Sequence, residues 1–224
     1  MKFTASAAAV ISVTAWLSTP MGPPLAQAAP CPDVDVVFAR GTDEPPGVGV
    51  VGQTFVDAFR ADVAGAKTVD VYPVNYPASR DYATGVDGVI DAGNHVRDVA
   101  ASCPETEIVL GGYSQGAGVI ALLTSDGTAA ESPALPNLPG PLPPGVADQV
   151  AAVALFGKPS NELVDSLGMP PLTVGPLYAA KTIDLCVDGD PICSTDQNNS
   201  IVPHLLYGVN GMAAQAARFA AGQL

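Results

Sequence analysis

Five short runs of β-branched and other apolar residues recur along the chain, with spacers of helical length between them. Strands of a parallel sheet are covered by helices on both faces, so they are apolar nearly throughout, whereas a strand with one solvated face alternates. The runs therefore predict five parallel strands, over residues 35–39, 69–74, 107–111, 150–156 and 182–185.

The spacers between these runs carry the apolar stripes of amphipathic helices. Phe55, Phe59 and Val63 recur at every fourth position, and this stripe ends near Gly65. Less regular stripes predict helices over residues 86–99, 117–123 and 205–219. The alternation predicts an α/β fold, a three-layer α/β/α sandwich around a doubly wound, five-stranded parallel sheet.

One segment interrupts the alternation of strands and helices. Six of the twelve residues from Pro133 to Pro144 are proline, which excludes a helix interior or a central strand there. Because the fourth predicted strand follows almost at once, we interpret this segment as an extended, stiff surface loop rather than a linker between domains. A proline-rich ligand for another protein is the less favoured alternative.

Residues 1–28 have the features of an export signal. Lys2 precedes a mostly apolar stretch over 5–17 that is too short to span a bilayer comfortably, and Ala26-Gln27-Ala28 offers small residues at the two positions that a signal peptidase reads. We predict that this signal peptide is removed, which leaves 29–224 as a single secreted domain without stable membrane insertion. An uncleaved N-terminal anchor is the alternative.

Charge narrows the range of partners. Nine Lys and Arg residues face 22 Asp and Glu residues, which gives a formal net charge of −13. Nucleic acids and anionic membranes bind clustered basic residues, so this balance argues against either as a partner. Hydrophobic residue types make up 48% of the chain, which is enough for a continuous core and too much for a disordered protein.

Export favours disulfide bonds over a metal site for the four cysteines, Cys31, Cys103, Cys186 and Cys193. Cys31 and Cys103 each precede a predicted strand, at the amino edge of the sheet, whereas Cys186 follows the last strand at the opposite edge. A five-residue strand spans ~17 Å, and a disulfide requires Cα atoms within ~7 Å. The predicted pairs are therefore Cys31–Cys103 and Cys186–Cys193, and we expect no metal ion.

The third predicted strand leads into Gly112-Tyr113-Ser114-Gln115-Gly116, a G-x-S-x-G sequence. In a nucleophile elbow of this kind, a serine stands exposed on a tight turn between a strand and a helix, and the small residues on either side let the backbones pack closely. The apolar run before the motif and the helical pattern after it fit that context. We therefore predict that Ser114 is a catalytic nucleophile.

A serine hydroxyl needs a base to become nucleophilic, and the chain has two histidines, His95 and His204. In α/β-hydrolases the order along the chain is nucleophile, acid, base, and the base lies on a loop after the last strand. His204 meets both conditions, and we predict that it is the base. We interpret His95, in the middle of a predicted helix, as a solvated surface residue.

The acid has to hold the histidine in the correct tautomer from a rigid position. Asp188 and Asp190 lie inside the small ring that a Cys186–Cys193 disulfide closes, at the carboxyl end of the fifth predicted strand. We favour Asp190, between Gly189 and Pro191, and keep Asp188 as the alternative. Three aspartates on earlier connections are interpreted as solvated charges: Asp126, Asp148 and Asp165.

An oxyanion hole requires backbone N–H donors beside the nucleophile. The residue after the nucleophile supplies the first donor, so Gln115 is the first candidate. The second donor comes from a loop after an early strand at the same edge of the sheet, and Ala39-Arg40-Gly41-Thr42 leaves the first strand there. Thr42 is the second candidate, with a hydroxyl that adds to its N–H group; a simple turn is the alternative.

Four segments, in this order along the chain, resemble the signatures of the cutinases and cutinase-like serine esterases, and together they span essentially all of 29–224. They are FARGT at 38–42, GGYSQG at 111–116, CVDGDPIC at 186–193 and PHLLYG at 203–208. The resemblance implies a cutinase-like α/β-hydrolase fold and both disulfides. It also implies a site made of Ser114, Asp190 and His204 as the triad, with Thr42 and Gln115 at the oxyanion hole.

Two features depart from the fungal members of this family. Thr42 stands where they often carry serine, a change that keeps the hydroxyl. The proline-rich segment over 133–144 looks longer than its compact fungal counterpart and resembles that of bacterial cutinase-like proteins. Those relatives hydrolyse fatty-acid esters, lipids or polyesters with varied preference, so the resemblance leaves the natural substrate and the acyl chain length open.

We therefore expect a secreted serine esterase, a monomer without a cofactor, that hydrolyses fatty-acid or cutin-type polyester bonds through an acyl-enzyme. Its only expected partner is an ester or lipid substrate. Leu205 and Leu206 either line an acyl groove or pack the last helix. The alternatives are an acyltransferase on the same fold, which passes the acyl group to an alcohol, and a secreted binding protein with an inactive triad.

Overall fold

The structure, a computed structural model, describes residues 1–2, 30–127, 129, 132–194 and 200–224. Cys31–Leu224 form one compact unit, and Met1–Pro30 form a separate one. The predicted export signal falls almost entirely outside the described residues.

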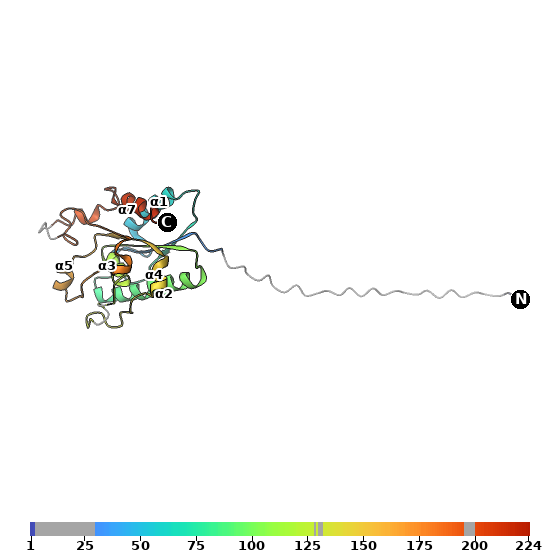
Figure 1. The fold of residues 1–224 in the computed structure, drawn as a ribbon, viewed down its shortest axis with the longest axis horizontal. Helices are drawn as coiled ribbons and strands as arrows, with labels where there is room; N and C mark the ends of the chain where they lie inside the picture. Colours follow the sequence, from blue (N-terminus) through green and yellow to red (C-terminus); the bar gives the residue numbers. More distant parts are fainter. Residues whose placement is uncertain (3–29, 128, 130–131, 195–199) are drawn as a thin grey trace. The chain divides into compact units, whose positions relative to one another are not determined.

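Five strands form a single parallel sheet between the helices (Figure 1). The strand order is β2-β1-β3-β4-β5. The strands are β1 (Val34–Ala39), β2 (Val69–Pro73), β3 (Glu107–Tyr113), β4 (Val150–Phe156) and β5 (Thr182–Leu185). Each lies within two residues of the apolar run that predicted it. Since Ala39 pairs with Gly112, the carboxyl ends of β1 and β3 lie side by side at one edge of the sheet.

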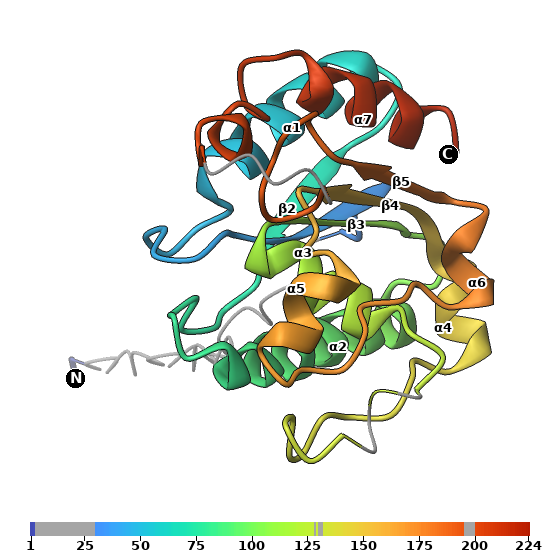
Figure 2. The ribbon, with the colours of Figure 1, turned by 90° about the vertical axis from the view of Figure 1, so that its left-hand side faces the viewer.

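Helices cover both faces of this sheet, which confirms the predicted three-layer sandwich (Figure 2). One face carries α1 (Gly49–Asp62) and α7 (Met212–Ala221). The other carries α2 (Gly85–Ser102) and α3 (Gln115–Leu123). Shorter elements connect them: η1 (Tyr82–Thr84), α4 (Pro144–Gln149), α5 (Asn161–Ser166), α6 (Pro176–Ala179) and η3 (Pro203–Leu205).

The sheet separates two apolar cores, as a doubly wound fold requires. Aromatic rings fill the core under α1 and α7, where Phe38, Phe55 and Phe156 pack against one another and are fully buried. Smaller aliphatic side chains such as Leu110 and Ile120 fill the core on the α2 and α3 side. Both faces of the central strands are therefore dry, which explains their near-continuous apolar sequence.

The last helix differs from its prediction over 205–219. It begins only at Met212, because Gly211 has a left-handed backbone (φ 89°) that ends the preceding turn. The first part of the predicted helix is instead the short turn η3 and a loop. The residues around His204 are therefore held by a tight turn rather than by a long helix.

The proline-rich segment forms neither helix nor strand from Pro133 to Pro143, as predicted, and Pro144 opens α4 at a position where proline is well tolerated. It is nevertheless anchored to the core. Three of its leucines point into the core on the α2 and α3 side and are at least nine-tenths buried: Leu135, Leu138 and Leu142. The segment is thus a fixed part of the domain.

Both predicted disulfides are present, Cys31–Cys103 and Cys186–Cys193. Their Cα atoms are 5.7 and 5.8 Å apart, which is an ordinary separation. The first joins the chain ahead of β1 to the end of α2, and the second closes a seven-residue separation after β5. The two pairs thus lie at opposite edges of the sheet, and the predicted pairing is confirmed.

The interpretation of His95 as a solvated residue was wrong. Its Nε2 atom lies 2.6 Å from Oδ2 of Asp35, a β1 carboxylate that is only 4% exposed. Its ring stacks on that of Tyr72, with the ring centroids 3.6 Å apart. An aspartate inside an apolar strand requires a buried partner, and this requirement was the signal in the sequence for the contact.

Within the described part of the chain, no helix combines the length and the apolar character that crossing a membrane requires. The same residues contain no cluster of three or more His, Cys, Asp or Glu side chains suited to a metal ion.

Candidate active site

Ser114 lies in the sharp turn between β3 and α3, with a backbone conformation (φ 55°, ψ −120°) that L-residues rarely adopt. The flanking glycines make this turn possible. A Cβ atom on Gly116 would collide with the carbonyl of Ala39, and one on Gly112 would collide with the carbonyl of Gly116. The G-x-S-x-G sequence thus forms the predicted elbow, with the serine side chain only partly buried.

A continuous chain of hydrogen bonds joins Ser114, His204 and Asp190. The Oγ atom of Ser114 lies 2.8 Å from Nε2 of His204, and Nδ1 of His204 lies 2.7 Å from Oδ2 of Asp190. An ionised carboxylate only accepts hydrogen bonds, so Nδ1 donates to Asp190. The other ring nitrogen, Nε2, is then an acceptor directed at the serine hydroxyl.

The Asp190 side chain is fully buried and is held by three hydrogen-bond donors. Besides His204, the Tyr207 hydroxyl donates to Oδ2 (2.6 Å), and the Ile192 N–H donates to Oδ1 (2.8 Å). Burial alone would raise the pKa of Asp190, but the bonds from His204, Tyr207 and Ile192 outweigh burial and hold the pKa below its ordinary value. The alternative, Asp188, is exposed.

Tyr207 is a site residue that the sequence analysis missed. Its ring is fully buried, and its hydroxyl also accepts a hydrogen bond from the Val187 N–H (3.0 Å). It therefore joins the turn that carries His204 to the loop that carries Asp190. The signal in the sequence was a tyrosine three positions after His204, placed next to residues that the prediction already included.

Tyr113, the last residue of β3, fixes the histidine from the other side. Its hydroxyl donates a 2.7 Å hydrogen bond to the His204 carbonyl, and its ring lies 5.0 Å, centroid to centroid, from the imidazole. Both the backbone and the ring of His204 are thus in contact with the strand that leads to Ser114.

The two predicted oxyanion-hole residues are in contact beside Ser114. The Thr42 hydroxyl donates to the side-chain oxygen of Gln115 (3.2 Å), and the Gln115 side-chain amide donates to the Ser79 carbonyl (3.1 Å). Gln115 is the first residue of α3, where a backbone N–H has no acceptor within the helix. Its N–H is therefore available to a negative charge that develops next to Ser114.

Arg40 holds the loop that carries Thr42, a role that the sequence analysis did not assign. Its buried guanidinium donates to the carbonyls of Glu44 (2.8 Å) and Tyr76 (2.6 Å), which belong to segments after β1 and after β2. Glu44 in turn accepts a hydrogen bond from the Gly41 N–H (2.6 Å). This network fixes Thr42 relative to the sheet edge.

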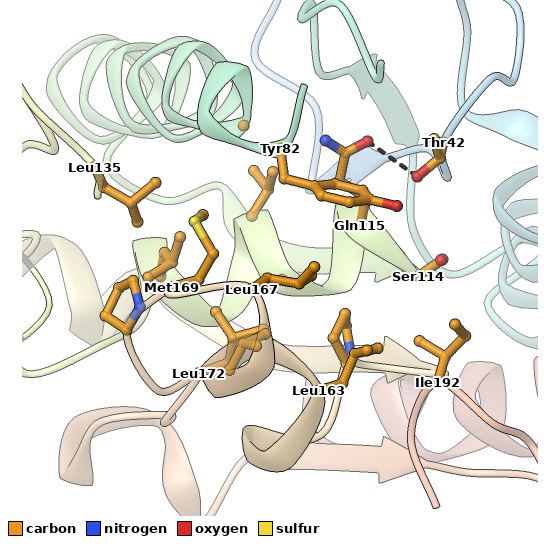
Figure 3. Close-up of a pocket in the computed structure, with 17 residues that line it drawn as sticks. Thr42, Tyr82, Ser114, Gln115, Leu135, Leu163, Leu167, Met169, Leu172 and Ile192 are labelled. Atoms are coloured by element: carbon orange, nitrogen blue, oxygen red, sulfur yellow. Dashed lines mark hydrogen bonds between the residues drawn. The ribbon is translucent and has the colours of Figure 1, made fainter. Parts of the chain in front are cut away.

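An apolar pocket of about 210 Å³ opens beside Ser114 (Figure 3). Thr42, Ser114 and Gln115 supply the polar part of its wall. Leucines, methionine and other apolar residues from α3, α5 and the segment after α5 supply most of the rest. The site therefore combines a hydroxyl, a base and hydrogen-bond donors with a dry surface for an alkyl group.

The suggestion that Leu205 and Leu206 line an acyl groove is not supported by this pocket, since neither is among the described residues of its wall. Leu205 is 63% exposed. The interpretation of three further aspartates as surface residues is confirmed by their exposure: Asp126, Asp148 and Asp165.

Comparison with known proteins identifies a single family along this chain. The family model described as Cutinase matches residues 30–224. The carboxylesterase Culp1 of Mycobacterium tuberculosis is 48% identical over 219 residues, which cover 96% of this chain and 92% of Culp1. The phospholipase Culp4 of the same species is 46% identical over 218 residues, which cover 97% of this chain and 89% of Culp4.

A solved structure gives the same result. The cutinase of Trichoderma reesei, in complex with a phosphonate inhibitor, superimposes with a TM-score of 0.64 at 36% sequence identity. The match covers 87% of this chain and 77% of that cutinase.

Proposed function

Because the chain belongs to the cutinase family, we propose that this carboxylic ester hydrolase works through an acyl-enzyme formed on Ser114. The observation that carries the proposal is the hydrogen-bonded chain from Ser114 through His204 to Asp190, at the mouth of an apolar pocket. A nucleophile, a base and an orienting acid in this arrangement are what acyl transfer to a serine requires.

In the acylation step, the Ser114 oxygen attacks the ester carbonyl carbon, and its proton passes to Nε2 of His204. The carbonyl oxygen becomes an oxyanion, which the N–H groups of Gln115 and Thr42 stabilise. The Thr42 hydroxyl joins them when it turns from the Gln115 side-chain oxygen to the oxyanion. The C–O bond to the alcohol then breaks, and the leaving oxygen takes the proton from His204. Asp190 stabilises the imidazolium that exists between these two proton transfers.

Water completes the reaction. It attacks the acyl-enzyme carbonyl while His204 Nε2 takes one of its protons, and the collapse of the second oxyanion returns that proton to the Ser114 oxygen. The products are a carboxylic acid and the free enzyme. An alcohol in place of water would give a transesterified product, so the fate of the acyl group distinguishes the hydrolase from the acyltransferase.

We also propose that the protein is exported and that it is a monomer. The predicted signal at 1–28 and two disulfides support a protein that matures in an oxidising compartment as residues 29–224. The names of the curated relatives, a carboxylesterase and a phospholipase, support fatty-acid or lipid esters as the substrate class.

The test is the hydrolysis of p-nitrophenyl esters by the purified protein and its Ser114→Ala variant. We expect the substitution to lower kcat by more than about 10⁴-fold, because no other group replaces the nucleophile. A fluorophosphonate should label Ser114 and inactivate the enzyme. Ser102→Ala, at an exposed serine at the end of α2, is the matched control and should retain full activity.

Two results would count against this proposal. If Ser114→Ala hydrolyses every ester as fast as the wild type, the acyl-enzyme is not formed on Ser114. If the wild type neither hydrolyses an ester nor reacts with the fluorophosphonate, the protein is a binding protein instead. Product analysis with added short alcohols then separates hydrolysis from acyl transfer.

A further inference from the structure

The apolar pocket beside Ser114 is polar at one end only. Figure 3 shows Ser114 and Thr42 at one end and Leu135 at the other, with Leu163, Leu167 and Met169 between them. Leu135 is 1% exposed, so the far end of the pocket is closed by a buried side chain. A ligand that fits this wall has one polar group near Ser114 and an unbroken hydrocarbon part beyond it.

The position of His204 decides which half of an ester enters the pocket. The leaving alcohol must receive its proton from Nε2 of His204, so the alcohol has to lie on the histidine side of Ser114. Among the described residues, the pocket wall includes Ser114 and Gln115 but not His204. The group that enters the pocket is therefore the acyl chain.

Gly118, one turn along α3 from Ser114, lies in the pocket wall against Leu172. A Cβ atom on Gly118 would lie 3.3 Å from Cδ1 of Leu172, so a larger side chain at this position would have to displace Leu172. The glycine thus lets Leu172 pack directly against α3 and fixes the side wall of the pocket.

The wall includes the exposed side chains of Tyr82 and Leu167, so the pocket is open to solvent on one side, and its volume limits how many carbons of the chain it covers. A dry apolar cavity of about 150 Å³ accommodates benzene, a molecule of six carbons. On the same scale, a pocket of about 210 Å³ accommodates about eight carbons.

The far wall belongs to the proline-rich segment, which takes no part in the proposed reaction. Pro133 and Pro136 restrict the backbone on both sides of Leu135, and Leu138 and Leu142 anchor the following residues in the core. A rigid, anchored backbone holds Leu135 in place when a chain presses against it.

We propose that this pocket holds the acyl chain, and that Leu135 on the proline-rich segment is the end wall that selects acyl chains of about eight carbons. The proposal rests on the proposed function, because it places the ester carbonyl at Ser114. Each methylene that the pocket covers raises kcat/KM about fourfold, and methylenes beyond Leu135 add nothing or lower it.

The experiment measures kcat/KM for p-nitrophenyl esters of straight-chain acids from acetate to palmitate. We expect a maximum near octanoate for the wild type. Leu135→Ala should move the maximum to longer acids, since it removes the end wall. Leu138→Ala is the matched control: it shortens a buried leucine of the same segment that does not line the pocket, so it should lower thermal stability without moving the maximum.

A second pair of variants tests the side wall of the pocket without removing a core side chain. Gly118→Leu would push Leu172 and the new side chain into the pocket, and it should lower the octanoate-to-acetate ratio of kcat/KM by at least about tenfold. Gly145→Leu, on the exposed surface of α4 with open space around it, is the matched control and should leave the ratio unchanged.

Several outcomes would overturn the inference while the proposed function stands. These are a flat acyl-length profile, an equal shift of the maximum in Leu135→Ala and Leu138→Ala, or an equal ratio in the two leucine-for-glycine variants. A length dependence confined to acetate esters of graded alcohols would assign the pocket to the alcohol. Failure of the proposed function gives a different result, because Ser114→Ala would then hydrolyse every ester as fast as the wild type.

Discussion

At the scale of single residues, Ser114 holds a backbone conformation that costs about 1–3 kcal/mol and is kept only because its surroundings fix it. The Ser114 N–H donates to the Phe156 carbonyl on β4 (2.9 Å), and the Ser114 carbonyl accepts from the Gly118 N–H at the start of α3 (3.1 Å). These bonds tie the turn to both neighbouring elements. In return, the turn directs Oγ at His204 instead of into the sheet.

Tyr207 provides a residue-scale test of how the acid is held. Its hydroxyl hydrogen bond helps to keep the pKa of Asp190 low, so Tyr207→Phe should raise that pKa. As the pH falls, a carboxyl with a higher pKa takes up its proton at a higher pH, and a protonated Asp190 no longer stabilises the imidazolium. We expect the acid limb of the kcat/KM profile to move to higher pH, and the free energy of unfolding to fall by about 1.5–3 kcal/mol.

Tyr178→Phe is the control for this prediction. Tyr178 is equally buried, but its hydroxyl has no hydrogen-bond partner among the described residues, so its removal should leave the pH profile in place. Equal pH profiles for both variants, with only a loss of stability in Tyr207→Phe, would mean that Tyr207 supports the fold and does not tune the site.

At the scale of elements, the two disulfides should have different effects. On the chain-entropy model, Cys31–Cys103 contributes about 4 kcal/mol to stability and Cys186–Cys193 about 2.5 kcal/mol, because the first closes a much longer loop. The smaller ring contains Asp190, and its Ile192 carbonyl accepts a hydrogen bond from Ser160, at the start of α5 (2.8 Å). Without this disulfide, Asp190 should lose its fixed position while the rest of the domain stays folded.

We therefore expect the double substitution Cys186→Ser with Cys193→Ser to lower kcat strongly while Tm falls only slightly. Cys31→Ser with Cys103→Ser should lower Tm more and leave kcat of the folded enzyme nearly unchanged. Esterase assays and thermal unfolding of both variants provide the measurement. Equal proportional losses of kcat and stability in the two variants would show that the small ring has no separate function at the site.

The sequence predicted those elements whose pattern of residues lies within one short stretch of the chain. The run around Val153 is apolar because both faces of β4 are covered, and the glycines around Ser114 record close contacts of one turn. By contrast, α5 and α6 have only six and four residues, too few for a helical stripe to be read. The partner of His95 was missed because Asp35 is 60 residues away and meets it only after the sheet has formed.

At the scale of the whole molecule, the site follows from topology. Strand order places the ends of β1 and β3 next to each other, so Thr42 and Ser114 meet although 72 residues separate them, and the later strands bring Asp190 and His204 to the same edge. The order of the motifs was therefore sufficient to predict that these side chains meet at one edge of the sheet. The pocket was not predictable in this way, since its walls depend on how α3, α5 and the proline-rich segment pack together.

The net charge of −13 is a property of the whole chain that should control its activity at lipid surfaces. Charges repel over about 30 Å at 0.01 M salt and over about 8 Å at 0.15 M salt. On an emulsion of a neutral ester that contains anionic lipid, we expect slower hydrolysis than on the same emulsion without it at low salt. Raising the salt concentration should bring the two rates together, because screening removes the repulsion between enzyme and surface.

A soluble ester at the same salt concentrations is the control for this measurement, since it has no charged surface to approach and its rate should vary little with salt. Hydrolysis that is faster on the anionic emulsion at low salt would contradict the prediction. It would mean that a local group of cations at the mouth of the site outweighs the acidic rest of the molecule. The long-range field then would not govern how this enzyme reaches an ester at an interface.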